Sequence, residues 1–240
     1  MKKLLSVSFL FFLSVASASA QAGVSLGGTR LIFDGNKKET SLTVYSNEGD
    51  THPYLIHSFL DNNGEKGDKI NNEKPPFIVT PPLFRLEPGK ENAVRVVKAG
   101  APLPEDRESV FWLNVRAIPG TNKNQKEENT LKLTLKNRIK LFYRPSALVK
   151  GKESETFSGV TFTHAGSGLI VRNPTPYFIS FSSLRVGGKN VNTDFIMVPP
   201  KGESRYLMPV GVSGTSVEWS YITDYGSASN TLKGSLKYGS

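Results

Sequence analysis

The chain has 240 residues, no cysteine, and 30 Lys and Arg against 21 Asp and Glu, for a formal net charge of +9. The absence of cysteine excludes disulfides, thiol catalysis and thiolate metal sites. Such a basic balance would suggest nucleic acid in a cytosolic protein. The N-terminus predicts export, so we expect no nucleic acid and interpret the charge as attraction for a carboxylate-bearing partner or as an aid to solubility.

The N-terminus has the order of a secretory signal peptide: Lys2 and Lys3, an apolar run from Leu4 to about Ala16, then Ala18-Ser19-Ala20. The apolar run is too short to span a bilayer, which takes about 20 residues. We therefore predict a signal peptide over residues 1–20, export of the remainder and no membrane insertion. Cleavage after Ala22 would also satisfy the small-residue pattern.

The rest of the chain is long enough for two domains of about 100 residues each. Short β-rich runs separated by turns fall into two groups, and no long helical period appears. The first group is Ser41–Ser46, Tyr54–Leu60, Phe77–Thr80, Ala93–Lys98, Val110–Ile118 and Thr130–Tyr143. The second is Gly159–Thr163, Gly168–Arg172, Phe178–Val186, Arg205–Leu207, Ser216–Thr223 and Thr231–Tyr238.

Two such groups predict an all-β protein with two immunoglobulin-like β-sandwich domains. We place the domains at residues 21–146 and 147–240, because Pro145 would stop a central strand.

The last run of the first group alternates strictly. Its apolar positions are Leu131, Leu133, Leu135, Ile139 and Leu141, and its polar positions are Lys132, Thr134, Lys136, Arg138 and Lys140. This period of two predicts a long strand with one apolar and one basic face, and such cations are typical of an edge strand. Either the leucines pack on the chain's own core, or the strand offers its backbone and apolar face to a partner.

Catalytic signatures are weak. His52, His57 and His164 show no metal-ligand spacing. The G-x-S-x-G match at residues 23–27 lacks the strand–turn–helix context that this motif requires. Carboxylates such as Asp106, Glu108 and Asp224 are more simply explained by pairing with arginine. We therefore predict a binding or assembly protein without catalytic residues, metal or cofactor.

Six segments, in this order, resemble the PapD-like periplasmic pilus chaperones: Val24–Leu26 with Thr29-Arg30, Thr80–Gly89, Leu103–Ser109, Ile139–Pro145, Asn173–Tyr177 and Thr223–Gly226. The resemblance covers essentially the whole mature chain. It implies two immunoglobulin-like domains in an L-shaped, boomerang arrangement. It also implies a non-enzymatic chaperone in the periplasm that binds, folds and caps pilus (fimbrial) subunits and delivers them to an outer-membrane usher.

By the same resemblance, the chaperone completes the subunit with one of its own strands, a mechanism called donor-strand complementation. Leu131, Leu133 and Leu135 would be the donor strand, which would also allow self-association. The resemblance further implies a cis Thr80–Pro81 peptide bond. The short, cysteine-free connection Pro119–Asn129 resembles the short-loop subclass, which serves rod-like pili.

Two groups of charges also take roles from the resemblance. Arg30 and Lys140 would anchor the C-terminal carboxylate of the subunit, while Glu108, Arg144 and Asp224 would form a structural charged cluster between the domains. Lys140 has the opposite parity from the donor leucines. Strong twist, a bulge near Asn137, or separate faces for carboxylate and groove would each account for that parity.

The alternative is a secreted immunoglobulin-like adhesin or lectin module. Such a protein would need exposed aromatic side chains at its loops, whereas Trp112 and Trp219 fall within expected strands and are interpreted as core. The sequence does not identify the pilus system.

Overall fold

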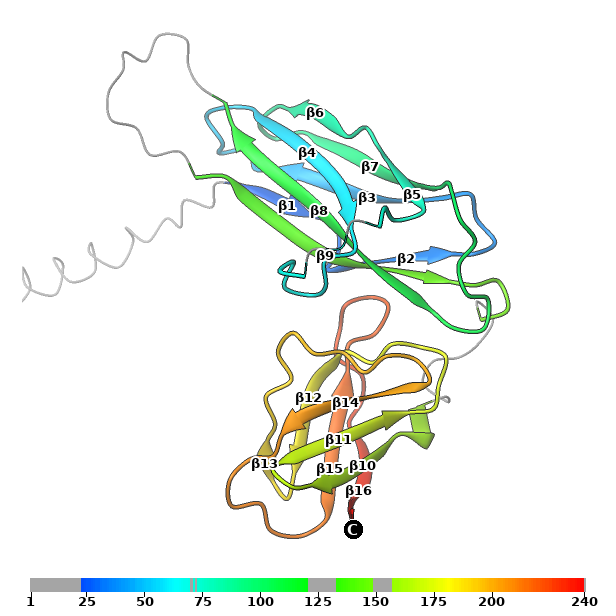
Figure 1. Cartoon of the computed structure of the whole chain (residues 1–240). Coiled ribbons are helices and arrows are strands. Elements are labelled where there is room, and N and C mark those ends of the chain that lie inside the picture. The colour runs from blue at the N-terminus through cyan, green and yellow to red at the C-terminus, as the bar shows by residue number, and fades with distance from the viewer. Residues whose placement is uncertain (1–22, 70, 72, 121–132, 149–156, 240) are drawn as a thin grey trace, which may run out of the picture.

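The computed structural model describes residues 23–69, 71, 73–120, 133–148 and 157–239 (Figure 1). The predicted signal peptide, Leu131 and most of the Pro119–Asn129 connection lie outside these residues. No helix within the described ranges is long and apolar enough to cross a membrane. The structure is all-β with two sandwich domains set at an angle, which confirms the predicted fold class.

The N-terminal domain packs two sheets against each other. The first sheet has the order β1 (Val24–Leu26), β3 (Glu39–Ser46), β7 (Glu91–Lys98) and β5 (Phe77–Thr80). The second has the order β2 (Arg30–Asp34), β9 (Leu135–Arg144), β8 (Ser109–Pro119), β4 (Tyr54–Asp61) and β6 (Leu83–Leu86). Residues such as Phe33, Val44 and Leu113 fill the space between the sheets and are fully buried.

The C-terminal domain begins with a 3-10 turn, η1 (Phe157–Gly159). Its strands form one hydrogen-bonded order: β13 (Lys189–Asn190), β12 (Phe181–Val186), β15 (Ser216–Tyr221), β16 (Leu232–Tyr238), β10 (Thr161–Ala165), β11 (Gly168–Asn173) and β14 (Gly202–Leu207). The order curls around a single core, because Phe181 of β12 and Tyr206 of β14 contact each other with ring centroids 5.9 Å apart.

Several predicted boundaries were wrong, and four strands were not predicted. The short strands β1, β2, β6 and β13 carry too little alternation to be recognised. The predicted strand Thr130–Tyr143 begins only at Leu135 within the described residues, because pairing with β8 starts there, opposite Ala117. The Thr80–Pro81 peptide bond is cis, as the resemblance implied.

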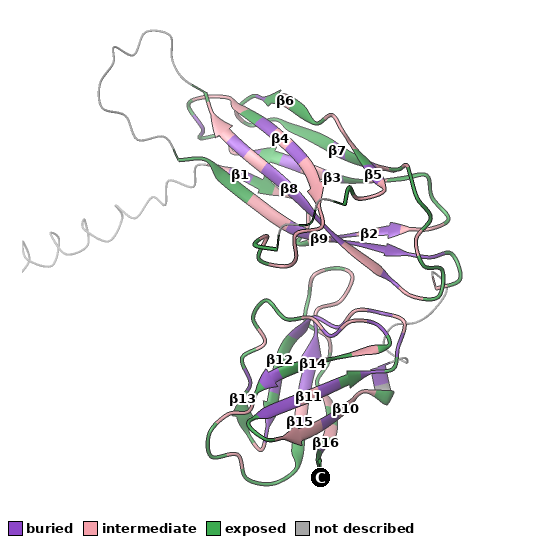
Figure 2. Cartoon of the chain, in the orientation of Figure 1, coloured by how far each residue is buried: buried purple, intermediate pink, exposed green. Residues whose placement is uncertain are grey.

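The strand β9 has two halves with different surroundings. Pairing with β8 runs without a register shift from Leu135 to Tyr143, so the strand has no bulge near Asn137. β2 pairs with Lys140–Arg144 alone, which leaves the outer edge of Leu135–Ile139 without a ladder partner among the described strands. Figure 2 shows β9 changing from exposed at its beginning to buried at its end.

The apolar side of this segment divides in the same way. Leu133 is 69% exposed and Leu135 is 52% exposed, whereas Ile139 and Leu141 are buried in the core. The alternating pattern therefore combines a core segment with an exposed apolar segment.

This division predicts different costs for the same truncation. Leu141→Ala should lower the free energy of unfolding by about 2–5 kcal/mol, because it leaves a cavity in a packed core. Leu135→Ala should cost less than about 1 kcal/mol, since half of that side chain is already in water. Urea unfolding of both variants measures the difference, and equal losses would show that Leu135 belongs to the core.

Candidate functional site

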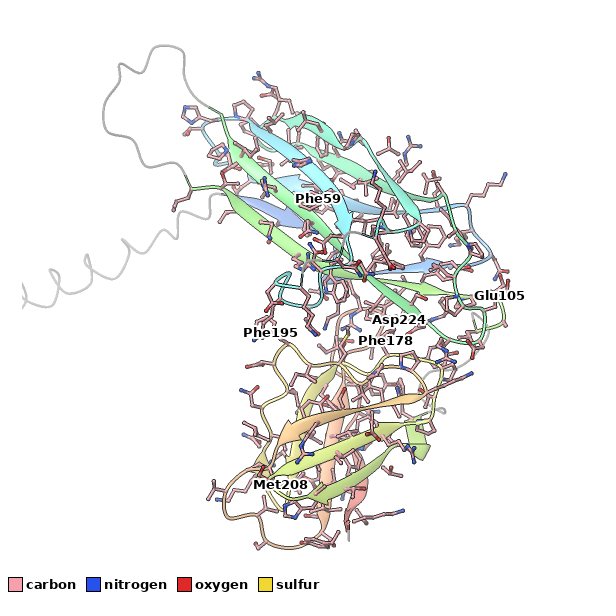
Figure 3. The ribbon with its side chains drawn as sticks, in the orientation of Figure 1. Phe59, Glu105, Phe178, Phe195, Met208 and Asp224 are labelled. Atoms are coloured by element: carbon pink, nitrogen blue, oxygen red, sulfur yellow. The ribbon has the colours of Figure 1, made fainter. Side chains whose placement is uncertain are left out.

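A cavity of about 350 Å³ opens between the domains. The N-terminal domain contributes Arg30, Glu65 and Lys140 to its lining, and the C-terminal domain contributes Phe195 and Ile222. In Figure 3, Phe195 lies at one side of this interdomain cleft, while Phe178 and Asp224 lie in the contact between the domains.

The even-numbered side chains of β9 from Arg138 to Arg144 face the second domain or the cavity. Lys140 reaches Ser180, the ring of Phe142 lies 5.8 Å from that of Phe178, and Arg144 pairs with Asp224. Their odd-numbered neighbours Leu141 and Tyr143 pack in the N-terminal core. Since successive side chains of a strand point to opposite faces, Lys140 and the exposed leucines lie on different faces, and no bulge is needed to explain their parity.

Arg30 and Lys140 lie directly opposite each other in the parallel pairing of β2 with β9. The structure therefore brings together the two residues predicted as a carboxylate anchor. Arg30 donates from Nη1 to the carbonyl oxygen of Ile222 over 2.8 Å, and its guanidinium lies 5.5 Å from the ring centroid of Phe142. The first contact ties the arginine to the second domain, and the second contact places it beside Phe142 of β9.

Lys140 already has a carboxylate partner. Its Nζ lies 2.5 Å from Oε1 of Glu65 and 3.4 Å from Oγ of Ser180. Burial lowers the pKa of Lys140 and the nearby charge of Arg30 lowers it further, while the ion pair with Glu65 acts in the opposite direction. The ammonium is thus partly desolvated and is stabilised by an anion.

The predicted charged cluster also forms. Arg144 binds Oε1 of Glu108 over 2.9 Å and both oxygens of Asp224 over 2.7 and 2.9 Å. Glu108 also accepts a hydrogen bond at Oε2 from the backbone N–H of Phe178, over 2.9 Å. Burial raises the pKa of Glu108, and the charges of Arg144 and Asp224 act on it with opposite signs. Because Phe178 and Asp224 belong to the second domain, the cluster links the two domains.

The sequence did not indicate a further ion pair, between Arg138 and Asp61. Arg138 donates to both oxygens of Asp61 over 2.6 and 2.7 Å, and to the carbonyl of Gly64 over 2.5 Å. In the sequence, Asp61 to Gly64 stand only in the turn region that follows the predicted strand Tyr54–Leu60. The acids Asp61 and Glu65 in one segment and the cations Arg138 and Lys140 in another are complementary, but only the fold reveals that the segments meet.

The other residues considered from the sequence lie elsewhere. His52 contacts Thr51, His57 stacks near Phe59 and His164 near Tyr238. Throughout the described ranges, no three or more His, Cys, Asp or Glu side chains are grouped as metal ligands. Trp112 and Trp219 are both buried. Trp219 packs in the core of the C-terminal domain as predicted, whereas Trp112 lies outside the N-terminal core and lines the interdomain cavity, with the guanidinium of Arg138 5.3 Å from its ring centroid.

Comparison with known proteins gives a consistent result across the chain. Residues 23–149 match the family described as "Pili and flagellar-assembly chaperone, PapD N-terminal domain", and residues 155–233 match "Pili assembly chaperone PapD, C-terminal domain". The chain is 39% identical over 232 residues to the chaperone protein LpfB of Salmonella typhimurium, with 96% of each protein covered.

Solved structures agree with these matches. The chain superposes on the E. coli chaperone DraB with a TM-score of 0.76 and 35% identity, covering 90% of this chain and 97% of DraB. It superposes on a chain from the complex of the Salmonella enterica SafA pilin with the SafB chaperone with a TM-score of 0.78 and 33% identity, covering 91% and 99% of the two chains.

The charged cluster gives a prediction about stability. Asp224→Ala should lower the free energy of unfolding by about 1–3 kcal/mol, because it removes both of its oxygens from a partly buried arginine. Asp106→Ala is the matched control, since Asp106 also meets a cation of the other domain, Lys201, over 2.6 Å but in an exposed pair. Thermal melts of the two variants provide the measurement. An unchanged melt for Asp224→Ala would contradict a structural role for the cluster.

Proposed function

Because the chain belongs to the PapD-like family of pilus-assembly chaperones, we propose that it binds, folds and caps fimbrial subunits and delivers them to an outer-membrane usher. The family consists of non-enzymatic assembly proteins, so the prediction that the chain is not an enzyme is confirmed. SafB is found in a complex with a pilin, which supports a pilus subunit as the partner of this chain. We assign the protein to the periplasm, after export by the N-terminal segment, and assign the domains to residues 21–146 and 147–240.

The observation that carries the proposal is the first half of β9, whose outer edge has no partner among the described strands and whose Leu135 is exposed. An open strand edge offers a row of backbone donors and acceptors to another chain. Here that edge runs along Leu135–Ile139, and exposed leucine side chains accompany it. In donor-strand complementation, Leu133 and Leu135, together with Leu131 outside the described residues, would enter the groove of a subunit that lacks one strand.

The anchor lies where this open edge ends. A subunit strand could pair with the open edge of β9 and end with its carboxylate at Arg30 and Lys140. It would then run parallel to β9, along the same edge to which β2 is hydrogen-bonded from Arg30 onward. Two cations suit a carboxylate removed from water, because each oxygen can accept a charged hydrogen bond. The anchor would fix the register, and the leucines would fill successive pockets.

The leucine side chains and the backbone hydrogen bonds of the donor strand would differ in their selectivity for the subunit. Each buried leucine is worth at most about 1.5–3 kcal/mol, and each backbone hydrogen bond about 0.5–1.5 kcal/mol net. Backbone pairing does not depend on the sequence of the subunit, so one chaperone can serve several subunits of a fibre. The same open edge would allow two chaperones to associate in the absence of a subunit.

The adhesin or lectin alternative makes a different demand on the protein. A chaperone must be recovered from periplasmic extract with a stoichiometric fibre subunit, whereas a sugar-binding module need not be. Affinity purification of the tagged protein, co-expressed with the subunits of its own pilus, therefore tests the proposal directly. Recovery of the protein without any subunit would contradict it.

The anchor assignment gives the next prediction. Arg30→Ala and Lys140→Ala should each weaken subunit capture by about 2–5 kcal/mol, because each removes a charged donor from a desolvated carboxylate. Lys136→Ala is the control, since Lys136 is an exposed cation of the same strand. Co-purification measures capture, and circular dichroism checks the fold. Near-normal capture by both anchor variants would exclude these residues as the anchor.

The donor leucines give a separate prediction. Leu133→Glu should abolish capture, because it would place an unpaired charge in an apolar pocket of the subunit. It should leave the free chaperone folded, since Leu133 is largely exposed. Leu83→Glu makes the same change at an exposed leucine on β6, at the opposite edge of the sheet, and should retain capture. Unfolding of the isolated Leu133→Glu protein would instead assign this leucine to the core.

A further inference from the structure

The cavity between the domains contains a carboxylate of the chain itself. Glu65 lies 2.5 Å from the ammonium of Lys140, and both side chains are largely withdrawn from water, at 19% and 18% exposure. Arg30 lines the same cavity. Glu65 therefore occupies the place where the proposed function requires a carboxylate from the subunit.

The segment that carries Glu65 is held in place. It follows β4 and is the cyan-to-teal loop of Figure 1, on the side of the first domain that faces the second. Arg138 binds Asp61 at the beginning of this loop and the carbonyl of Gly64 next to Glu65. Gly67 has a φ of 74° and passes so close to Arg138 that an added Cβ would lie 3.3 Å from Cζ. The loop is thus shaped around Arg138, two positions before Lys140 on the same face of β9.

The second domain forms the other wall of the cavity that contains Glu65. The ammonium of Lys66 lies 5.2 Å from the ring centroid of Phe195. Phe195 lines the cavity from the loop before β14 and is labelled in Figure 3. Glu65 thus sits in a partly enclosed cavity with walls from both domains, rather than on an open surface.

We propose that Glu65 is an internal substitute for the subunit's C-terminal carboxylate. In the free chaperone Glu65 pairs with Lys140, and the carboxylate of a binding subunit displaces it. This inference rests on the proposed function and adds a residue that determines affinity. Glu65 competes for the anchor, so that a ligand must offer a carboxylate, and not merely a strand, to bind well.

The physical reason is the cost of two carboxylates in one partly buried space. Like charges that close together repel strongly when water is excluded. The incoming carboxylate would lie beside both Arg30 and Lys140, and Glu65 contacts the same Lys140 ammonium. When the subunit leaves, Glu65 pairs with Lys140 again. The partly buried ammonium therefore does not remain without an anion, which would be unfavourable.

If Glu65 supported ligand binding instead of competing with it, the effect of its removal on affinity would have the opposite sign. If Glu65 only positioned Lys140 for the ligand, its removal would weaken binding. If Glu65 competes, its removal strengthens binding, and only for ligands that end in a carboxylate. The two roles are therefore distinguished by the sign of one measurement.

The experiment uses the intact mature protein and two synthetic probes, a peptide of alternating valine and threonine with a free C-terminal carboxylate and the same peptide with a C-terminal amide. Calorimetry compares wild type, Glu65→Gln and Asp68→Asn. Asp68 is an exposed acid of the same loop, so its variant makes the same change in net charge. Glu65→Gln should bind the carboxylate peptide about tenfold more tightly than wild type. The amide peptide and the Asp68→Asn variant should show no gain.

Unchanged or weaker binding by Glu65→Gln, or no detectable binding of the carboxylate peptide to this variant, would overturn the inference. So would an equal gain for both peptides, or the same gain in Asp68→Asn. Glu65→Ala should reproduce the result, which separates competition from any new contact made by glutamine. Failure of the proposed function is distinguishable, because it appears as the absence of a co-purifying subunit with the wild-type protein. Failure of the anchor assignment alone appears as normal capture by Lys140→Ala. If Lys140→Ala loses capture but Glu65→Gln is unchanged, only the present inference fails.

Discussion

Among the described residues, the strand β9 is hydrogen-bonded along both edges in its second half and along one edge in its first half. The arrangement of both domains depends on this strand. β8 accompanies the strand over Leu135–Tyr143, while β2 joins only at Lys140. The core residues of β9 lie in the doubly paired half and at Ile139 just before it. In the proposed function, the singly paired half offers its backbone groups to another chain, together with the side chains of Leu135 and of Leu133 just before the strand. A single strand can thus be both a structural element of its own domain and a binding element.

Its cleft-facing side imposes a second constraint, because cations withdrawn from water need anions. Arg138, Lys140 and Arg144 form a row along this face, with Phe142 between the last two. Each cation has a carboxylate partner: Asp61 for Arg138, Glu65 for Lys140, and Glu108 with Asp224 for Arg144. From Arg138 onward the basic side of the alternating pattern is therefore not a solvated face, although Lys136 before it is exposed. These ion pairs attach the loop after β4 and the second domain to β9.

The sequence was sufficient for the all-β class, the two domains and the pairing of residues that the family motifs mark, such as Arg144 with Asp224. It was not sufficient for Asp61 and Glu65. Their partners lie more than 70 positions away in the chain, and neither acid stands in a recognisable motif. The start of β9 was also misplaced, because alternation continues through Leu133 although pairing with β8 begins at Leu135. Side-chain periodicity records which face is apolar, whereas the end of a strand depends on where its neighbour's backbone is.

The three cations of the row differ in how readily an anion could be exchanged. Arg138 and Arg144 are arginines that bind both oxygens of a carboxylate, and each makes further contacts to a carbonyl or a second acid. Such planar, bidentate pairs are geometrically specific and lose several hydrogen bonds together when broken. Lys140 is a point charge with one short contact to Glu65 and one long contact to Ser180. An ammonium can accept a new carboxylate from another direction without losing a fixed geometry. The exchangeable position is therefore the central one, flanked by two pairs that keep the loop and the second domain in place while the anion at Lys140 changes.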